Sequence, residues 1–441
     1  MSDENSPDGF NPDDFAKFLQ ELLSGNGQIN AEELARVAGL PNDPLVLQAL
    51  IKQLQQAISQ GDSQTVAGVN WTVASQQAVA AAHEGSISVS DRTKSAIVEA
   101  NKIATLWLDQ ATNLSSLASE PKLVTREVWV QDALPLFQEL AGPIAERVAN
   151  ALTENLQQNL PSELEGLAKG ASGIMRSAGG ALFAMQLGSA LGKLSHDVLT
   201  GGDIGLPFYT ESRAAFIPQN LGNFITENEL VEDQAYIYLS VREMAHARLF
   251  RHSRWLREAV ITQLTNYAHG ITIDGEAMSE LASSITPENA EALKNALESG
   301  ALLAERTEEQ LAALQSIETL LALIEGWVEV VTDQSTKLLP TASTLDEVLR
   351  RRRATSSPAQ ATFATLVGLE LRPRRNREAA AFWKTITESI GVEARDAIWD
   401  HPDLLPTSED IDNVEQYLQR IQSGEDSMDQ ALRELLDGNQ S

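Results

Sequence analysis

The sequence predicts a mainly α fold with one small strand or loop region near 200–226. Apolar residues recur at helical spacing along nearly the whole chain. Residues that favour helix starts (Ser, Thr, Asp and Asn) precede many of these runs. Only residues 197–226 interrupt the pattern, because glycines and prolines separate short runs of apolar and aromatic residues. Glycines and prolines placed in this way are typical of short strands or of a long ordered loop.

The N-terminal part of the chain is expected to be helical after a short tail. Residues 1–13 are acidic and polar and have neither the basic nor the apolar region of a signal peptide, so we expect disorder there. Residues 14–120 form a predicted N-terminal helical segment. Its expected helices span 14–23, 30–37, a stretch that begins at Asp43 and a stretch with Asp91 as its N-cap.

Residues 121–405 form the predicted main domain, and an acidic C-terminal helix and tail follow over 406–441. The first helix of this domain begins at Thr125. Pro135 and Pro143 should kink or split it, because proline lacks an N–H group and clashes with the preceding turn. Further helices are expected over 228–250, 253–269 and 287–298, from Thr307 to about Leu338, and from Thr344 onward.

The charge of the chain restricts its partners. Its 441 residues include 33 Lys and Arg against 62 Asp and Glu, which gives a formal net charge of −29. This excess argues against nucleic acids and anionic membrane surfaces, because binding to either needs clustered positive charge. The chain has no cysteine, which fits a reducing compartment, and we expect a cytoplasmic protein.

The stretch from Ser177 to Gly192 is apolar enough to be weighed as a membrane span. Its 16 residues fall short of the roughly 20 that a helix needs to cross a bilayer. We therefore expect no membrane insertion. The stretch is interpreted as a buried helix whose small residues let neighbouring helices approach closely.

The strongest chemical signal is the pentapeptide Arg242-Glu243-Met244-Ala245-His246. It reads as the zinc-protease motif H-E-x-x-H with arginine in place of the first histidine. In the intact motif, both histidines lie on one face of a helix and hold Zn²⁺, and the glutamate activates the metal-bound water. A guanidinium is a permanent cation that cannot coordinate metal, so Arg242 leaves the motif one ligand short.

A further ligand would come from elsewhere in the chain. The best candidate is Glu325, which precedes Gly326 in an otherwise apolar helix and so combines a carboxylate with space for a metal. Another candidate is His252, which follows His246 at the spacing of the third histidine in a related zinc-protease motif. That motif has a glycine where this chain has Leu249, and in a continuous helix His252 points about 240° away from His246.

Three blocks of sequence carry a resemblance to a known family: 242–257, 324–333 and 366–375. The chain resembles bacterial zincin-like hydrolases and zinc-dependent metalloproteases over residues 120–400, approximately. The resemblance implies a zincin-like helical body, zinc as the cofactor and hydrolysis of peptide or amide bonds.

The resemblance also implies roles for single residues. Glu243 would be the general base, and His246 and Glu325 would be zinc ligands. Trp327, where some relatives carry a histidine, and Glu329 would lie behind these ligands.

Arginine at position 242 allows a second interpretation. Arg242 would place its guanidinium where zinc would sit and pair with Glu325 or Glu243, which neutralises costly buried charges. The chain would then be a catalytically inactive relative that serves as a binding or scaffold protein. Both interpretations give a peptide or protein as substrate or partner. Replacing Arg242 with histidine should create or strengthen zinc binding if the rest of the site is competent.

Two basic islands, 350–353 and 372–375, stand out in this acidic chain. Each would either receive an anionic ligand or an acidic partner, or pair with the chain's own surplus carboxylates.

Overall fold

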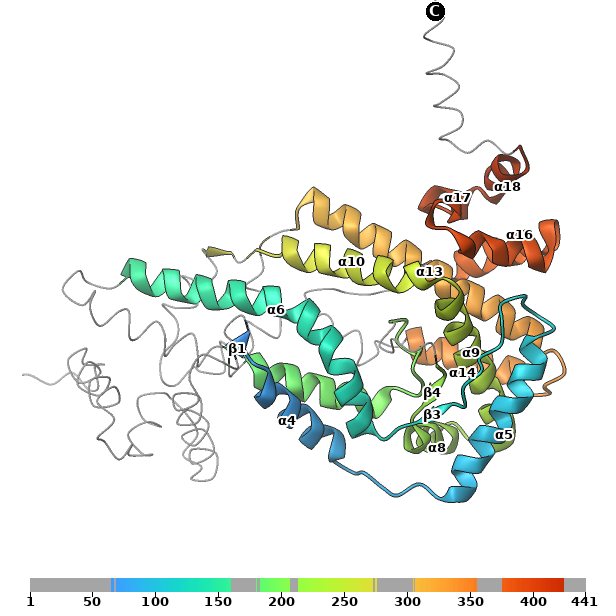
Figure 1. The fold of residues 1–441 in the computed structure, drawn as a ribbon, viewed down its shortest axis with the longest axis horizontal. Helices are drawn as coiled ribbons and strands as arrows, with labels where there is room; N and C mark the ends of the chain where they lie inside the picture. The colour runs from blue at the N-terminus through green and yellow to red at the C-terminus, as the bar shows by residue number, and fades with distance from the viewer. Residues whose placement is uncertain are drawn as a thin grey trace, which may run out of the picture.

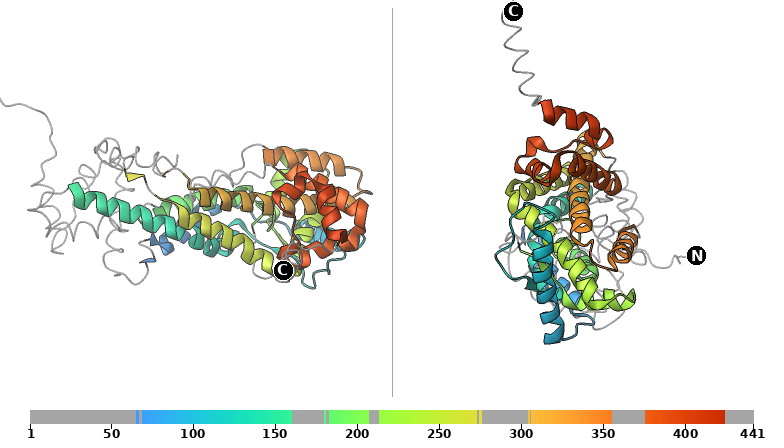
Figure 2. Two further views of the ribbon diagram at one scale, coloured as in Figure 1. Left: turned by 90° about the horizontal axis from the view of Figure 1, so that it is seen from above. Right: turned by 90° about the vertical axis from the view of Figure 1, so that its right-hand side faces the viewer.

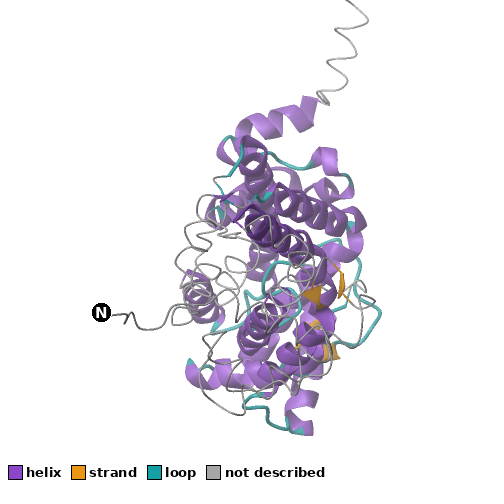
Figure 3. Cartoon of the chain, turned by 90° about the vertical axis from the view of Figure 1, so that its left-hand side faces the viewer, coloured by secondary structure: helices purple, strands orange, loops and turns teal. Residues whose placement is uncertain are grey.

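The computed structural model describes residues 65–66, 69–159, 180, 183–206, 213–272, 274–275, 304, 306–354 and 375–423. Within them the fold is mainly α, as predicted, with two very small sheets (Figures 1 and 3). The longer helices are α4 (Trp71–His83), α5 (Asp91–Leu108), α6 (Arg126–Asn159), a helix over 183–197, α8 (Pro218–Glu227), α9 (Glu232–His252), α10 (Arg254–Gly270), α13 (Glu308–Ser335), α14 (Ala342–Ala354), α16 (Asn376–Ala397) and α18 (Val414–Ser423). The expected elements 1–13, 14–23, 30–37, the helix from Asp43 and 287–298 lie outside the described residues.

Helix α13 lies at the centre of the described part of the molecule. It packs against α9, α10 and α16, and α10 and α13 run along the long axis (Figure 2). Its start is set by a reciprocal capping box between Thr307 and Gln310, which satisfies free N–H groups of the first turn. Among the described helices, α13 alone is long and apolar enough to cross a membrane, and half of its apolar window is buried inside the protein. Burial of this kind is also what a core helix requires.

Helix α9 carries the arginine-containing motif and is surrounded by protein. It packs against α5 on one side and α13 on another (Figure 1). Its side chains are buried on nearly every face between Ala235 and Phe250, charged residues included. Because a buried charge is costly unless it is paired or hydrogen-bonded, each charged group on α9 needs a partner.

The strand expected near 200–226 is β4 (Ala215–Phe216). It pairs in parallel with β3 (Lys122–Leu123), which lies outside the region where strands were expected. An isolated bridge from Thr200 occupies the other edge of β4. The end of the region is helical instead, because Pro218 fits the first turn of α8, where the missing N–H group costs nothing.

The glycines of the 183–197 helix permit close packing, as predicted. A Cβ at Gly188 would lie 2.5 Å from the carbonyl oxygen of Ala74, and a Cβ at Gly192 would lie 2.4 Å from the Cβ of Ala81. Both contacts are with α4, so only glycine lets these two helices approach this closely.

The prolines of α6 act as predicted, and the N-cap of α5 differs from the prediction by one residue. Helix α6 continues through Pro135 and Pro143 and bends part-way along its length (Figure 1), so the prolines kink it without splitting it. The N-cap of α5 is Ser90, whose hydroxyl accepts from Thr93, and Asp91 is the first helical residue.

Candidate functional site

The motif side chains meet a small cavity where α9, α13 and the turn at 200–203 come together. Its volume is about 20 Å³, which is space for roughly one water molecule. The charged or titratable residues that line it are Asp203, Arg242, Glu243, His246 and Glu325. The structure thus brings Arg242, Glu243, His246 and Glu325 together, although Glu325 lies far from the motif in the sequence.

Arg242 pairs with Glu325 across the interface of α9 and α13. Its Nη2 donates to Oε2 of Glu325 at 2.5 Å, and the two side chains are only 12% and 8% exposed. Burial alone would lower the pKa of Arg242, but the charge of Glu325, together with those of the nearby Tyr238, Glu329 and Asp203, outweighs burial and raises that pKa. The pair is therefore a buried, charge-assisted hydrogen bond between two ions.

A second arginine reaches the same carboxylate. Nη1 of Arg353, near the end of α14, lies 2.9 Å from Oε2 of Glu325. Burial would raise the pKa of Glu325, but Arg353 and Arg242 together hold it below its ordinary value. Sequence reasoning missed this contact, because nothing in the sequence of the arginine run links Arg353 to Glu325.

The neighbouring arginines of α14 are also paired. Arg352 binds Asp203 through both terminal nitrogens, at 3.0 and 2.9 Å, and also donates to the carbonyl of Asp197. Arg350 pairs with Glu329 at 2.7 Å. The first basic island is thus ion-paired within the chain. Of the second island, the structure describes Arg375, which contacts Asp412.

Glu243 lines the same cavity, and its carboxylate binds backbone. Its two carboxylate oxygens accept from the N–H groups of Gly202, at 2.8 Å, and Ala215, at 2.9 Å. Burial raises the pKa of Glu243 to about 7, although these hydrogen bonds oppose the shift. Glu243 therefore ties the motif helix to β4 and to the 200–203 turn.

His246 is buried and neutral. Burial lowers its pKa to about 4, and its ring lies 4.8 Å from that of Phe250. Within the described part of the chain, Nε2 of His246 has no hydrogen-bond partner. A Cβ at Gly202 would lie 2.6 Å from Nδ1 of this ring, so the close approach of the turn needs glycine.

His252 does not reach the cavity. Helix α9 continues to this residue, as its residue range shows, and Nε2 of His252 binds Asp400 at 2.6 Å. Because the helix is continuous, His252 points away from the face that carries His246. The structure therefore provides no place for His252 beside the predicted ligands.

Three other residues expected at the site have different roles in the structure. A Cβ at Gly326 would lie 2.7 Å from the backbone of Ala379, so this glycine makes room for α16 rather than for a metal. Glu329 lies one turn beyond Glu325 and binds Arg350. Trp327 is fully buried and does not line the cavity.

Comparison with known proteins agrees with the resemblance read from the motif blocks. The family model described as "Zincin-like metallopeptidase" matches residues 69–418, most of the chain. This chain belongs to the zincin-like metallopeptidase family. No curated protein matches the sequence.

One solved structure is similar to this family member. It is described as "a putative hydrolase with a novel fold" from Chloroflexus aurantiacus. The match has a TM-score of 0.55 and 20% sequence identity, and it covers 80% of this chain and 99% of the other. At that identity the likeness concerns the fold alone.

The residues of this zincin-like protein do not fit the zinc ion that its family implies. Catalytic zinc has about three protein ligands. His246, Glu325, Glu243 and Asp203 line the cavity, and Arg352 already binds Asp203 through two nitrogens. Oε2 of Glu325 is already shared by two guanidinium groups, and both oxygens of Glu243 accept from backbone. No group of three or more His, Asp or Glu side chains is arranged to hold a metal among the described residues.

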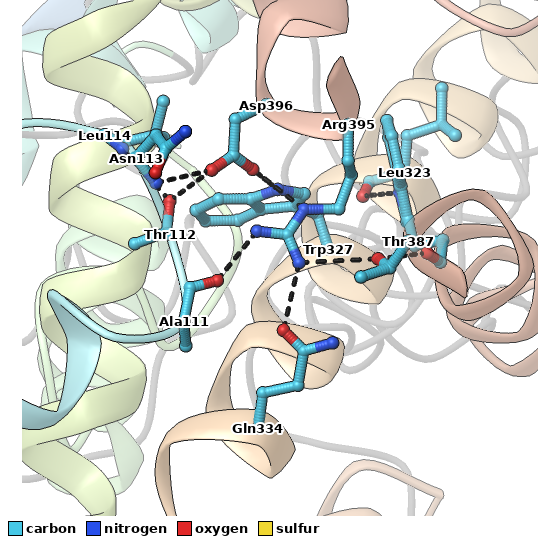
Figure 4. A network of polar contacts seen from close by, with 11 residues as sticks. Ala111, Thr112, Asn113, Leu114, Leu323, Trp327, Gln334, Thr387, Arg395 and Asp396 are labelled. Carbon is cyan, nitrogen blue, oxygen red and sulfur yellow. Dashed lines mark hydrogen bonds and ion pairs between the residues drawn. The ribbon is translucent and has the colours of Figure 1, made fainter. Parts of the chain in front are cut away.

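A buried polar network fixes the helix that carries Glu325. The carboxylate of Asp396 accepts from the indole N–H of Trp327 at 3.0 Å, from Thr112 and from Arg395 (Figure 4). Arg395 also donates to the carbonyl of Ala111. The network joins α13, α16 and the turn after α5, so the position of Glu325 depends on all three.

A larger groove opens one helical turn from the cavity. Its volume is about 780 Å³, within the range of roughly 300–1,000 Å³ typical of ligand sites. Tyr238, one turn before Arg242, and Glu329, one turn after Glu325, are among the residues that line it. Ala380 and Ala381 of α16 line it as well.

Proposed function

We propose that this member of the zincin-like metallopeptidase family binds no zinc and holds a peptide or protein segment without hydrolysing it. One observation carries the proposal: the guanidinium of Arg242 lies on Glu325, the carboxylate that would hold the metal. The site that hydrolyses bonds in a metallopeptidase would here be a buried ion pair that helps to hold α9 against α13.

Electrostatics supports the absence of zinc. A divalent cation near Glu325 would be repelled by Arg242 and Arg353, and each holds this carboxylate at hydrogen-bond distance. To bind zinc, the protein would have to break both buried ion pairs. Breaking a buried pair costs several kcal/mol, on the order of 3–5, when one charge is left without a partner.

The groove supports the second half of the proposal. The cavity at the motif has space for about one water, whereas the groove has the volume of a ligand site. A peptide in the groove would pass Tyr238 and Glu329, one turn from Arg242 and Glu325. In this proposal the chain binds a segment in the groove, beside a site that lacks the metal.

Metal content tests the first half. The full-length, untagged protein would be purified without chelators, dialysed against zinc and measured by mass spectrometry, with His246→Ala beside it. We expect no stoichiometric zinc in either protein. A content of about one zinc per chain that His246→Ala abolishes would refute the proposal, because such loss identifies a metal site at the motif.

Peptide binding tests the second half. A library of fluorescent peptides would be screened for binding, and the products would be checked for cleavage by mass spectrometry. Ala381→Trp fills the groove and should weaken binding, whereas Ser389→Trp, on an exposed part of α16 that does not line the groove, should not. Equal effects of the two substitutions, or cleavage of a bound peptide, would count against the proposal.

A second candidate function is metal-dependent hydrolysis of peptide or amide bonds, with Glu243 as base and His246 and Glu325 as ligands. One observation favours it: Nε2 of His246 is buried without a partner, and burial keeps the ring in the neutral form that metals need. This function would require Arg242 and Arg353 to leave Glu325. The same metal measurement separates the two candidates.

A further inference from the structure

Two cations from different helices share one oxygen of Glu325. Arg242 reaches it from α9 and Arg353 from α14, at 2.5 and 2.9 Å. The two guanidinium groups and the carboxylate between them carry a net charge of +1. Glu325 therefore has one partner more than neutrality requires, and the loss of either arginine leaves it paired.

Arg353 is held in place by its neighbours. Arg352, the preceding residue, forms the two-bond contact with Asp203, a residue of the turn whose Gly202 N–H binds Glu243. Leu345 and Leu349 anchor the same helix in the core. The end of α14 is thus held over the site by contacts that do not involve position 242.

We propose that Arg353 is a second metal-excluding residue, so that replacing Arg242 with histidine alone does not create a zinc site. This inference rests on the proposed absence of zinc in the natural chain. Histidine at position 242 would restore the ligand pair of the motif, but Glu325 would stay bound to Arg353. The three-ligand set, positions 242, 246 and 325, becomes available only when Arg353 is also removed.

The expected effect follows from the bond that zinc must displace. A hydrogen bond to a charged group is worth about 1.5–3 kcal/mol, so Arg353 should weaken zinc binding by a factor on the order of 10–150. The repulsion between the guanidinium and the metal adds to this factor.

The test compares four full-length proteins: the natural chain, Arg242→His, Arg353→Met and the double variant. Zinc affinity would be measured by titration calorimetry, and zinc content by mass spectrometry after dialysis. We expect about one zinc per chain in the double variant alone, as a three-ligand site requires. The matched control is Arg242→His with Arg350→Met, which removes an arginine of α14 that binds Glu329 instead and should behave as Arg242→His.

Thermal unfolding gives an independent readout. The double variant leaves Glu325 buried without a cation, so it should unfold at a lower temperature than the natural chain. Addition of zinc should raise that unfolding temperature again, because a ligand that binds only the folded state stabilises it. If the double variant does not fold, Arg353→Gln replaces Arg353→Met, since its amide is polar but carries no charge.

The outcomes separate this inference from the proposed function. Equal zinc affinity of Arg242→His and the double variant would refute the role of Arg353 and leave the natural chain zinc-free. A folded double variant that binds no zinc would refute it as well. Stoichiometric zinc in the natural chain, lost in His246→Ala, would instead refute the proposed function on which the inference rests.

Discussion

Glu325→Gln should destabilise this protein more than Arg242→Met, although the two substitutions remove opposite ends of the same ion pair. Glu325 is the single anion between two largely buried guanidinium groups, at 2.5 and 2.9 Å. Glutamine keeps the shape of the side chain and removes its charge, so two buried cations then face each other. Breaking a buried ion pair in this way costs about 3–5 kcal/mol of unfolding free energy.

Arg242→Met leaves a neutral cluster. Glu325 keeps Arg353, and the methionine fills most of the space of the arginine stem. The loss is that of one hydrogen bond between charged groups, about 1.5–3 kcal/mol. The difference between the two variants is therefore expected to be about 2 kcal/mol.

The assay is urea unfolding followed by tryptophan fluorescence. The fully buried Trp327, Trp383 and Trp399 report loss of the core around α13. Variants with the same dependence on urea can be compared by their midpoints. Glu329→Gln is the matched control, because it removes a pair with the half-exposed Arg350 one turn along α13 and should cost at most about 1 kcal/mol.

The reasoning would be refuted if Glu325→Gln cost no more than Arg242→Met. It would also be refuted if Glu325→Gln cost no more than Glu329→Gln. Either result would mean that the two guanidinium groups do not depend on the carboxylate between them.

Three further predictions concern the surroundings of the site. Gly202→Ala should lower the free energy of unfolding by about 1–3 kcal/mol, because its Cβ would lie 2.6 Å from the ring of His246. Gly222→Ala is the control and should not destabilise, because no atom lies within 4 Å of the new Cβ. The pKa of Glu243 is about 7 in the folded protein, above its ordinary value, so the stability that protonated Glu243 contributes is complete below pH 4.5 and is lost as the pH rises through 7. Between these pH values the natural chain should lose about 3 kcal/mol more unfolding free energy than Glu243→Gln, as measured by urea unfolding at each pH. Asp396→Asn leaves the buried Arg395 without its anion and should cost about 3–5 kcal/mol by the same assay, and a change below 1 kcal/mol would contradict the network of Figure 4.

The sequence by itself determined the class of fold and the chemistry of the motif helix. Helical spacing, capping residues and the glycines of the 183–197 helix are local signals, because each acts within a few residues or along one helix face. The replacement of histidine by Arg242 was also visible, since coordination depends on the side chain itself.

Only the tertiary structure decided which side chains surround Glu325. That Arg353 shares its carboxylate with Arg242, that Gly326 makes room for α16, and that β3 pairs with β4 are contacts between residues far apart in the sequence. The spacing of residues within one helix cannot predict them, because the relative positions of packed helices depend on how all their side chains fit together. A run of four arginines showed only that positive charge was present, and the packing of α14 against α9 directed one of them to the site.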